Sequence, residues 1–411
     1  MTATYDAIVV GAGPAGSTAA LLLARAGRSV ALLEAKPFPR AKVCGECIAA
    51  SNLPLLDALG VGETLRQCAG PELRRVALWR GDESITAGLP ARDERHPWGY
   101  ALRREHLDLL LIEAARAAGA AVLQPGKALA IRYLPPDARC EVEVAREGGL
   151  RLTLRAAVVI RAHGSWQPPP ADGTSGTRKE RRPSDLLAFK AHFQNTRLEE
   201  GLLPVLAFAG GYGGMVVTSD GLATLACCVR RDRLTACRRD EVDATVSAGE
   251  TIEALLSREC RGVRAALAGA SRVGPWLAAG PIRPGVRLGH SESGDFRIGN
   301  AAGEVHPIIG EGISMALQSA WLLCAQLTGC VDALRADARG EMLRRRIQQR
   351  YAALWRAHFC ARMRLAALFA HLAMRPGASL TPLIPLLRRA PALLSLAAYA
   401  SGKTRSAVIC A

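Results

Sequence analysis

Apolar and polar positions alternate in different ways along this chain. Near the N-terminus, Ala7–Val10 and Ser29–Leu33 are short continuous apolar runs, which are typical of strands buried on both faces of a sheet. Between them, Ser17–Arg25 has the spacing of a helix, and Gly27 follows as a stop signal. This strand–helix–strand order predicts an α/β fold with a parallel sheet.

A different pattern occupies the middle of the chain. Residues 184–193, 202–221 and 222–231 alternate in the manner of consecutive strands with tight turns, which predicts an antiparallel sheet. They follow a polar, proline-rich stretch at 167–183 that we interpret as a linker or mobile loop.

The C-terminal part combines basic and apolar positions at helical spacing, so residues 341–399 predict amphipathic helices. From Arg335 to Arg405 there are 14 Lys and Arg residues but only two acids, so most of the net charge of +16 lies here. These helices either close one wall of a site or form a cationic, apolar surface that touches a membrane or a lipidic substrate. Nucleic-acid motifs and stacking aromatic residues are missing, so we expect no nucleic-acid partner.

The length and the cysteine content narrow the class of protein. A chain of 411 residues is expected to form two or more domains. It has no secretory signal pattern and no uninterrupted apolar run of about 20 residues, and its twelve cysteines are scattered. These features predict reduced thiols and a protein that lies in the cytoplasm, either free or peripheral to the membrane.

The first predicted strand runs into a G-x-G-x-x-G motif. Gly11 allows a tight turn, Gly13 lets the backbone approach a pyrophosphate, and Gly16 lets helix and strand pack closely. Pro14 suits the first helical turn, and Glu34 at the tip of the second strand can accept hydrogen bonds from ribose hydroxyls. A carboxylate there would repel a ribose 2′-phosphate. The motif therefore predicts a dinucleotide cofactor with a free ribose, either FAD or NAD.

A second motif separates these two cofactors. From Phe296 the chain reads FRIGNAAGEVHPIIGEGISMALQSA, which resembles the second FAD fingerprint of the flavoprotein monooxygenase superfamily, including its ubiquinone-biosynthesis hydroxylases. The resemblance implies FAD, with Asn300 holding a ribityl hydroxyl. Gly310 and Gly312 would let the backbone and a helix N-terminus approach the isoalloxazine ring. His306 either fixes the loop before the proline or takes part in the chemistry.

Two further segments bear on this resemblance. The stretch from Tyr100 resembles the R-x-x-L-D element of the superfamily, which implies that Arg104 contacts FAD, with Arg103 as the competing choice. After the strand at 156–160, where the superfamily often has Asp-Gly, this chain has His163-Gly164. That departure weakens any inference about NAD(P)H binding. No second G-x-G-x-x-G is present, and the resemblance to single-component flavin hydroxylases implies that NAD(P)H docks transiently.

The segment KVCGEC carries a resemblance of its own. Its Lys42 and Cys44-Gly45 match the K-x-C-G element of geranylgeranyl reductases and their FixC-like relatives, in which the cysteine lies close to the flavin ring. Cys47 is then incidental, although a disulfide with Cys44 that exchanges electrons with FAD, or a packing role for Cys44, stays open. A zinc site is not expected, because it needs four ligands and the sequence has no second C-x-x-C and no H-x₃-H.

The resemblance also implies how the chain is divided. An FAD-binding domain at 1–62, 98–165 and 285–335 would be interleaved with an antiparallel-sheet substrate domain at 63–97 and 166–284, and a helical region at 336–411 would follow. Substrate contacts are expected from His192, Phe208, Tyr212 and Met215, and chemistry from Cys44 and His306. The motifs assign these residues to the cofactor: Gly11, Gly13, Pro14, Ala15, Gly16, Glu34, Ala35, Lys42, Cys44, Gly45, Arg104, Gly299, Asn300, Gly310, Gly312 and Ile313.

Three functions follow as hypotheses. The first is an FAD-dependent monooxygenase that uses NAD(P)H and O₂ to hydroxylate an apolar aromatic, quinone-like or polyketide-type molecule. The second is a geranylgeranyl-reductase-like enzyme acting on C=C or C–C bonds of a lipid-like substrate. The third is a flavin redox protein without turnover of its own. The chain lacks the W-x-W-x-I-P motif of flavin halogenases, which disfavours halogenation. It also lacks the Y-x-W-x-F-P motif of geranylgeranyl reductases and reads GGYGGMVV at the corresponding position, which weakens the second hypothesis.

Overall fold

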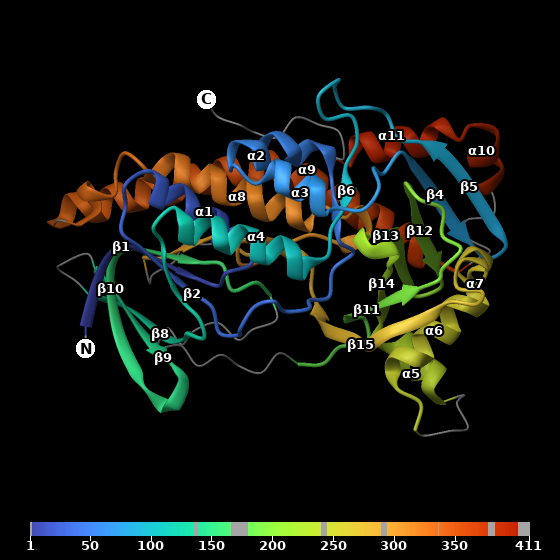
Figure 1. Cartoon of the computed structure of the whole chain (residues 1–411), viewed down its shortest axis with the longest axis horizontal. Helices are drawn as coiled ribbons and strands as arrows, with labels where there is room; N and C mark the ends of the chain where they lie inside the picture. Colours follow the sequence, from blue (N-terminus) through green and yellow to red (C-terminus); the bar gives the residue numbers. More distant parts are fainter. Residues whose placement is uncertain are drawn as a thin grey trace.

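Two seven-stranded sheets organise the part of the protein that the computed structural model describes, which is residues 2–134, 139–165, 180–239, 245–288, 294–335, 337–376 and 383–401. The first sheet lies at the left of Figure 1 and the second at the right, with long helices running above them. The α/β class expected from the sequence is confirmed. The exact domain boundaries stay a prediction.

The first sheet has a parallel centre and an antiparallel edge. Its order is β7-β2-β1-β10-β9-β8, with β17 also paired to β10. The strands are β1 (Thr2–Val10), β2 (Val30–Leu33), β7 (Ala121–Leu123), β8 (Lys127–Leu134), β9 (Arg139–Ala145), β10 (Arg151–Arg161) and β17 (Phe296–Arg297). Ala7 is paired in parallel with Val30 of β2 on one side and with Val158 of β10 on the other. The central strands are therefore buried on both faces, as their continuous apolar runs predicted.

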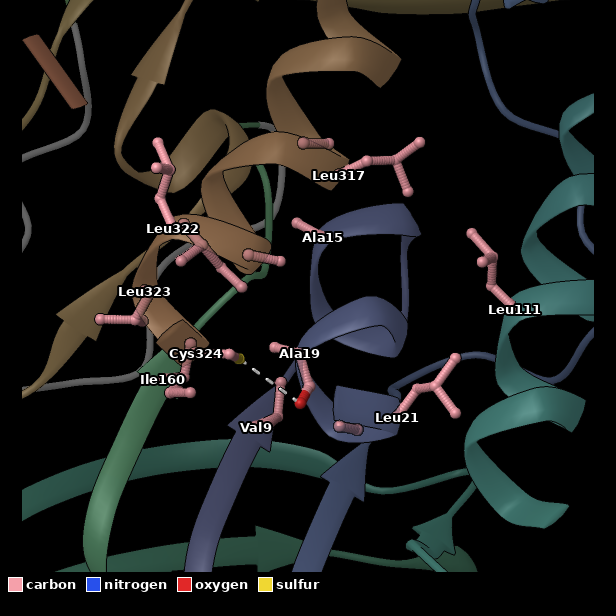
Figure 2. Packing of buried hydrophobic residues seen from close by; sticks show 14 of the residues in the cluster. Val9, Ala15, Ala19, Leu21, Leu111, Ile160, Leu317, Leu322, Leu323 and Cys324 are labelled. Carbon is pink, nitrogen blue, oxygen red and sulfur yellow. Dashed lines mark hydrogen bonds between the residues drawn. The ribbon is translucent and has the colours of Figure 1, made fainter. Parts of the chain in front are cut away.

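Three helices cover one face of this sheet: α1 (Pro14–Arg25), α4 (Arg104–Ala117) and α8 (Gly312–Leu327). Helix α1 begins three residues earlier than expected, because Pro14 already occupies its first turn behind the N-cap Gly13. Figure 2 shows the resulting core, in which Val9 and Ile160 of the sheet face Ala19 of α1 and Leu323 of α8.

The second sheet has the order β15-β11-β14-β13-β12-β4-β5. Its strands are β4 (Arg75–Arg80), β5 (Glu83–Gly88), β11 (Leu186–Gln194), β12 (Leu202–Phe208), β13 (Gly211–Val217), β14 (Ala223–Arg230) and β15 (Ser271–Ile282). The predicted strand region at 202–221 is a hairpin of two strands. All neighbours are antiparallel except β12 and β4, which run parallel. Helices α5 (Arg231–Arg239), α6 (Ala248–Glu259) and α7 (Arg261–Ala266) belong to this part of the chain, and α6 and α7 pack their apolar residues on one face of the sheet.

Short elements join the two sheets. Strand β3 (Cys47–Ile48) pairs with β6 (Tyr100–Ala101), and β16 (Gly285–Val286) pairs with β18 (Gly303–Glu304). Helices α2 (Leu53–Ala58) and α3 (Gly62–Cys68) follow β3, and single 3₁₀ turns lie at Gly299–Ala301 and Pro307–Ile309.

The C-terminal region is helical, as predicted. Helix α9 (Asp337–Met374) runs along the molecule, and α10 (Leu383–Arg389) and α11 (Ala392–Ala400) lie at the far end of the second sheet (Figure 1). Trp355 and Phe359 of α9 are fully buried in the core of the first sheet, whereas its last turns contact β12 and β13. Among the described residues, no helix is both long enough and apolar enough to span a bilayer.

Candidate functional site

The glycine-rich turn at the end of β1 has the geometry of a pyrophosphate cradle. Gly11 has a φ of +105°, and a Cβ there would lie 2.6 Å from the carbonyl oxygen of Ala162. A Cβ on Gly16 would lie 1.8 Å from the carbonyl oxygen of Gly11. Gly13, at the N-cap of α1, faces open space instead, with Arg104 Nη2 at 3.9 Å from the position of a Cβ. Helix and strand therefore pack closely while the helix N-terminus stays open to an anion.

Glu34 is buried at the tip of β2 and is tied to this turn. Its Oε2 accepts hydrogen bonds from the backbone N–H of Ala12 at 3.0 Å and from Arg40 at 3.1 Å. Its Oε1 accepts one from the backbone N–H of Lys36, next to Ala35, at 3.1 Å. The carboxylate thus holds the glycine turn and lies beside the path of a cofactor. Its bond to a ribose stays a prediction.

The structure brings Arg104, and not Arg103, to the glycine turn. Arg104 is buried, and its Nε and Nη2 donate to the two carboxylate oxygens of Asp108, each at 2.8 Å. Burial opposes the charge of Arg104, but Asp108 and the nearby Cys44 outweigh it and raise the pKa of the guanidinium. Arg103 instead pairs with Glu105 at 3.1 Å and with Asp220 at 3.4 Å, next to the second sheet.

Lys42 adds a second positive charge to the same place. Burial, together with the neighbouring Arg104 and Arg40, lowers the pKa of its amine to about 8. Its Nζ lies 3.9 Å from the position of a Cβ on Gly164. The neighbouring His163 has its pKa lowered to about 4 by burial and by Arg161. An anion here would relieve this crowding of positive charge, so the donor set fits a pyrophosphate.

The second fingerprint forms the opposite side of the site. Gly299 and Gly310 both have positive φ, +56° and +63°, and helix α8 starts at Gly312 with Ile313 buried behind it. Asn300 Nδ2 lies 3.4 Å from Ser165 Oγ and 3.3 Å from Glu304 Oε1. The contact of Asn300 with a ribityl chain therefore stays a prediction.

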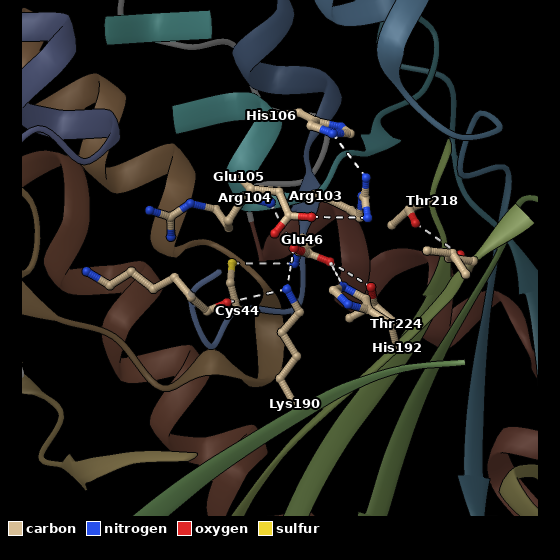
Figure 3. Close-up of polar contacts among 12 residues, drawn as sticks. Cys44, Glu46, Arg103, Arg104, Glu105, His106, Lys190, His192, Thr218 and Thr224 are labelled. Atoms are coloured by element: carbon tan, nitrogen blue, oxygen red, sulfur yellow. Dashed lines mark hydrogen bonds and ion pairs between the residues drawn. The ribbon is translucent and has the colours of Figure 1, made fainter. Parts of the chain in front are cut away.

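The loop KVCGEC contains a residue that the sequence did not single out, Glu46. It is fully buried, has a φ of +59°, and accepts hydrogen bonds from Thr224 Oγ1 at 2.6 Å and His192 Nε2 at 3.2 Å, and from Lys190. Figure 3 shows these groups converging on it from the second sheet. Burial alone would raise the pKa of Glu46, but His192 and Lys190 lower it to about 2. The sequence feature that could have indicated a buried acidic partner is Lys190, a charged residue inside the apolar strand β11.

Cys44 lies next to the buried carboxylate of Glu46 in the same loop. The backbone N–H of Glu46 points at Cys44 Sγ at 3.4 Å, and the thiol is near enough to Arg104 to affect the pKa of its guanidinium. Cys44 and Cys47 are both thiols and are not joined by a disulfide. The sulfur of Cys44 thus lies close both to Arg104 and to Glu46, whose other partners belong to the second sheet.

An apolar cavity of about 520 Å³ opens next to Cys44. Its walls come from the second sheet, from the loop Pro307–Gly310, and from helices α9, α10 and α11. Every described side chain that lines it is uncharged. Such a cavity suits an apolar molecule, because a charged one would lose its hydration without gaining a partner.

Two of the four predicted substrate residues line this cavity and two do not. Tyr212 and Met215 do. Phe208 lies on the other face of its strand, in the core beneath the helices, because residues two apart share a face and Ala207 is the one that faces the cavity. His192 is directed to Glu46 instead. His306 sits at the rim, and its Nδ1 lies 3.1 Å from Tyr212 Oη.

Residues 4–244 match the family model of the FAD binding domain. The chain belongs to this family. It is an FAD-dependent oxidoreductase in fold and family, which agrees with the glycine turn, the Arg104 contact and the second fingerprint. FAD fits the residues present: the open helix N-terminus, Arg104 and Lys42 would hold its pyrophosphate, and the flavin would extend toward Cys44 and Gly45.

Three curated proteins to which this FAD-binding chain is similar are named as reductases. It is 32% identical to menaquinone reductase of Mycobacterium tuberculosis over 163 residues, which cover 40% of this chain and 38% of that protein. It is 28% identical to menaquinone reductase of Mycolicibacterium smegmatis over 80% of this chain and 77% of that one. It is 26% identical to digeranylgeranylglycerophospholipid reductase 1 of Methanopyrus kandleri, over 87% and 89%.

Solved structures share the fold of this FAD-binding chain at lower identity. A myxobacterial chondrochloren halogenase superposes with a TM-score of 0.71 at 22% identity, covering 97% of this chain and 91% of that one. A geranylgeranyl bacteriochlorophyll reductase-like protein from Thermoplasma acidophilum superposes with a TM-score of 0.72 at 18% identity, covering 94% and 92%.

Proposed function

We propose that this protein is an FAD-dependent reductase of carbon–carbon double bonds in an apolar, lipid-like molecule. The observation that carries the proposal is the uncharged cavity whose wall includes Cys44 and Gly45 of the K-x-C-G element. This wall gives the reductase hypothesis precedence over hydroxylation, because it joins the cysteine of that element to a space for the substrate. The two reductases that align with this chain over most of their length also favour reduction over hydroxylation.

When bound, FAD would supply the hydride equivalent that it receives from NAD(P)H. The residues of the chain do the remaining work. Lys42 and Arg104 hold the pyrophosphate, and the apolar walls exclude water from the reacting carbons. Ala207 and Tyr212, which are paired on the same face of β12 and β13, limit the width of the cavity beside the sheet and so orient a long substrate.

The surface around the cavity suits a substrate that comes from a lipid phase. Leu387 and Ala398 of the C-terminal helices line the cavity, whereas Leu386 and Leu396 of the same helices are 51% and 60% exposed. A helix that is apolar on both sides is unusual at a surface in contact with water. We include peripheral contact of α10 and α11 with an anionic membrane in the proposal, because Arg389 and the basic residues of α9 flank them.

Anaerobic single turnover tests the proposal. The FAD-loaded protein is reduced with NADH or NADPH and mixed with menaquinone carrying an unsaturated side chain, or with geranylgeraniol. The proposal expects reoxidation of the flavin and a product whose isoprenoid chain has gained two hydrogens across one C=C bond, as distinct from reduction of the quinone ring to a quinol. Cys44→Ala should slow this step while FAD stays bound, and Cys68→Ala, at an exposed thiol, is the matched control.

Hydroxylation is the second candidate, because Pro307–Gly310 of the monooxygenase-like fingerprint line the same cavity. Turnover under ¹⁸O₂ with an alkylated phenol distinguishes the two reactions. Incorporation of ¹⁸O, with no reduction of any unsaturated lipid, would replace the reductase proposal by a monooxygenase. Failure of both NADH and NADPH to reduce the bound FAD would point to a redox protein without turnover.

A further inference from the structure

A tyrosine and two histidines form a row from the cavity to the protein surface. Tyr212 of β13 lines the cavity, and its Oη lies 3.1 Å from Nδ1 of His306. The ring of His306 lies edge-on to the ring of His371, with 6.0 Å between the ring centroids. His371 is exposed on α9. The row therefore crosses the wall between an apolar cavity and water.

We propose that Tyr212, His306 and His371 are a proton path, and that Tyr212 is the group that exchanges a proton with the substrate. Apart from Cys44 and Cys47, the polar side chains that line the cavity in the described part of the chain are Tyr212, the thiols of Cys227 and Cys228, and Ser401. Among these, only Tyr212 has an acidic hydroxyl with a partner that leads outward. The catalytic role of Tyr212 rests on the proposed function, whereas the connection between the three residues does not.

Reduction of a double bond needs such a path, because one carbon takes a hydride equivalent and the other takes a proton. The hydride equivalent would come from reduced FAD. Tyr212 would give its phenolic proton to the second carbon, and Nδ1–H of His306 would give its proton to the phenolate oxygen. Nε2 of His306 would take up a proton from His371 or from a water molecule between the two rings. His306 then changes tautomer, and no charge accumulates in the apolar wall.

The surroundings of the row favour this neutral transfer. Burial and the neighbouring His371 lower the pKa of His306 to about 4, so its imidazole is neutral near pH 7. Burial, Cys228 and Glu304 raise the pKa of Tyr212 well above its usual value, so the phenol keeps its proton until transfer. On the α9 side, His371 Nδ1 donates to the carbonyl of Ala367 at 2.6 Å, so its exposed Nε2 is the nitrogen that takes up a proton from water and passes it to Nε2 of His306.

Proton transfer through an exposed histidine can be tested by chemical rescue. His371→Gln should slow turnover of the FAD-loaded protein about tenfold or more, raise the solvent deuterium isotope effect, and regain rate when imidazole is added. Tyr212→Phe keeps the ring in the cavity wall and should lose turnover without rescue. His358→Gln is the matched control, because His358 also lies on α9 but contacts Phe359 and not His306.

A second readout does not depend on turnover. In ¹⁵N-histidine NMR of the protein, Tyr212→Phe should shift the Nδ1 resonance of His306, and His371→Gln should raise the titration midpoint of His306. If wild-type protein reduces no lipid but both NMR effects appear, the proposed function fails and the path stands. If wild-type protein turns over while His371→Gln is as fast and insensitive to imidazole, the path is overturned. Absence of both NMR effects also overturns it.

Discussion

Thr224 Oγ1 donates a hydrogen bond of 2.6 Å to the carboxylate of Glu46 across 178 positions of sequence. Glu46 belongs to the loop that carries Cys44, and Thr224 belongs to β14 of the second sheet. Lys190 forms a buried ion pair with the same carboxylate. Through these two contacts, Glu46 joins the loop of Cys44 to the second sheet, which lines the cavity. The first prediction tests the ion pair with Lys190.

Glu46→Gln should lower the free energy of unfolding by about 3–5 kcal/mol, because it leaves the charge of Lys190 buried without its carboxylate. Urea denaturation measures this change. Glu46→Gln combined with Lys190→Met should recover much of the loss. Glu63→Gln, which removes an exposed partner of Arg66, should change little. A loss below about 1 kcal/mol for Glu46→Gln would show that the pair is not buried as described.

FAD affinity should depend on the charge of Lys42. Its pKa is lowered to about 8 without an anion nearby, and a bound pyrophosphate favours the protonated amine. The affinity should therefore be highest well below pH 8 and fall as the pH rises through and above that value. Quenching of flavin fluorescence at pH 7 and pH 9 measures it. Lys42→Met should bind FAD more weakly at pH 7 and lose most of this pH dependence, and an equally steep fall in the variant would contradict the assignment.

Arg104 and Arg103 should differ sharply in their effect on FAD. Removal of Arg104 alone would leave Asp108 buried without a partner, so the informative comparison is Arg104→Met with Asp108→Asn against Asp108→Asn alone. The double variant should bind FAD about 10- to 100-fold more weakly, which corresponds to the loss of one charged hydrogen bond. Arg103→Met should leave the dissociation constant unchanged. If substitution of Arg103 weakened FAD binding as much as substitution of Arg104, the assignment of Arg104 to the pyrophosphate would be wrong.

The exposed leucines of α10 and α11 should mediate binding to anionic vesicles. Leu386→Glu with Leu396→Glu should reduce sedimentation with phosphatidylglycerol vesicles, because it places charge on the apolar face. Leu150→Glu is the matched control, since Leu150 is 58% exposed on a hairpin of the other sheet. Wild-type protein that stays in the supernatant would reject membrane contact.

The sequence predicts those parts of the site that depend on local backbone geometry. The turn at Gly11 and Gly16 follows from residues a few positions apart, so its fold and a dinucleotide cofactor with a free ribose could be inferred without the structure. The sequence does not predict which side chains of the second sheet face the cavity. Both faces of this sheet are apolar, so the pattern does not show that Ala207 faces the cavity and Phe208 the opposite core. The partners of Glu46 could not be inferred, since nothing in KVCGEC indicates which distant strand will cover it.

Helix α9 has a consequence for how substrate preference can change. It has 38 residues and is roughly 57 Å long. Its middle turns pack Trp355 into the core of the first sheet, whereas Phe369 and Leu372 near its end line the cavity. The glycine turn, Arg104 and the second fingerprint all precede it in the chain. Mutations accumulating in the last turns of α9 and in α10 and α11 can therefore reshape the cavity while the cofactor residues remain under separate selection.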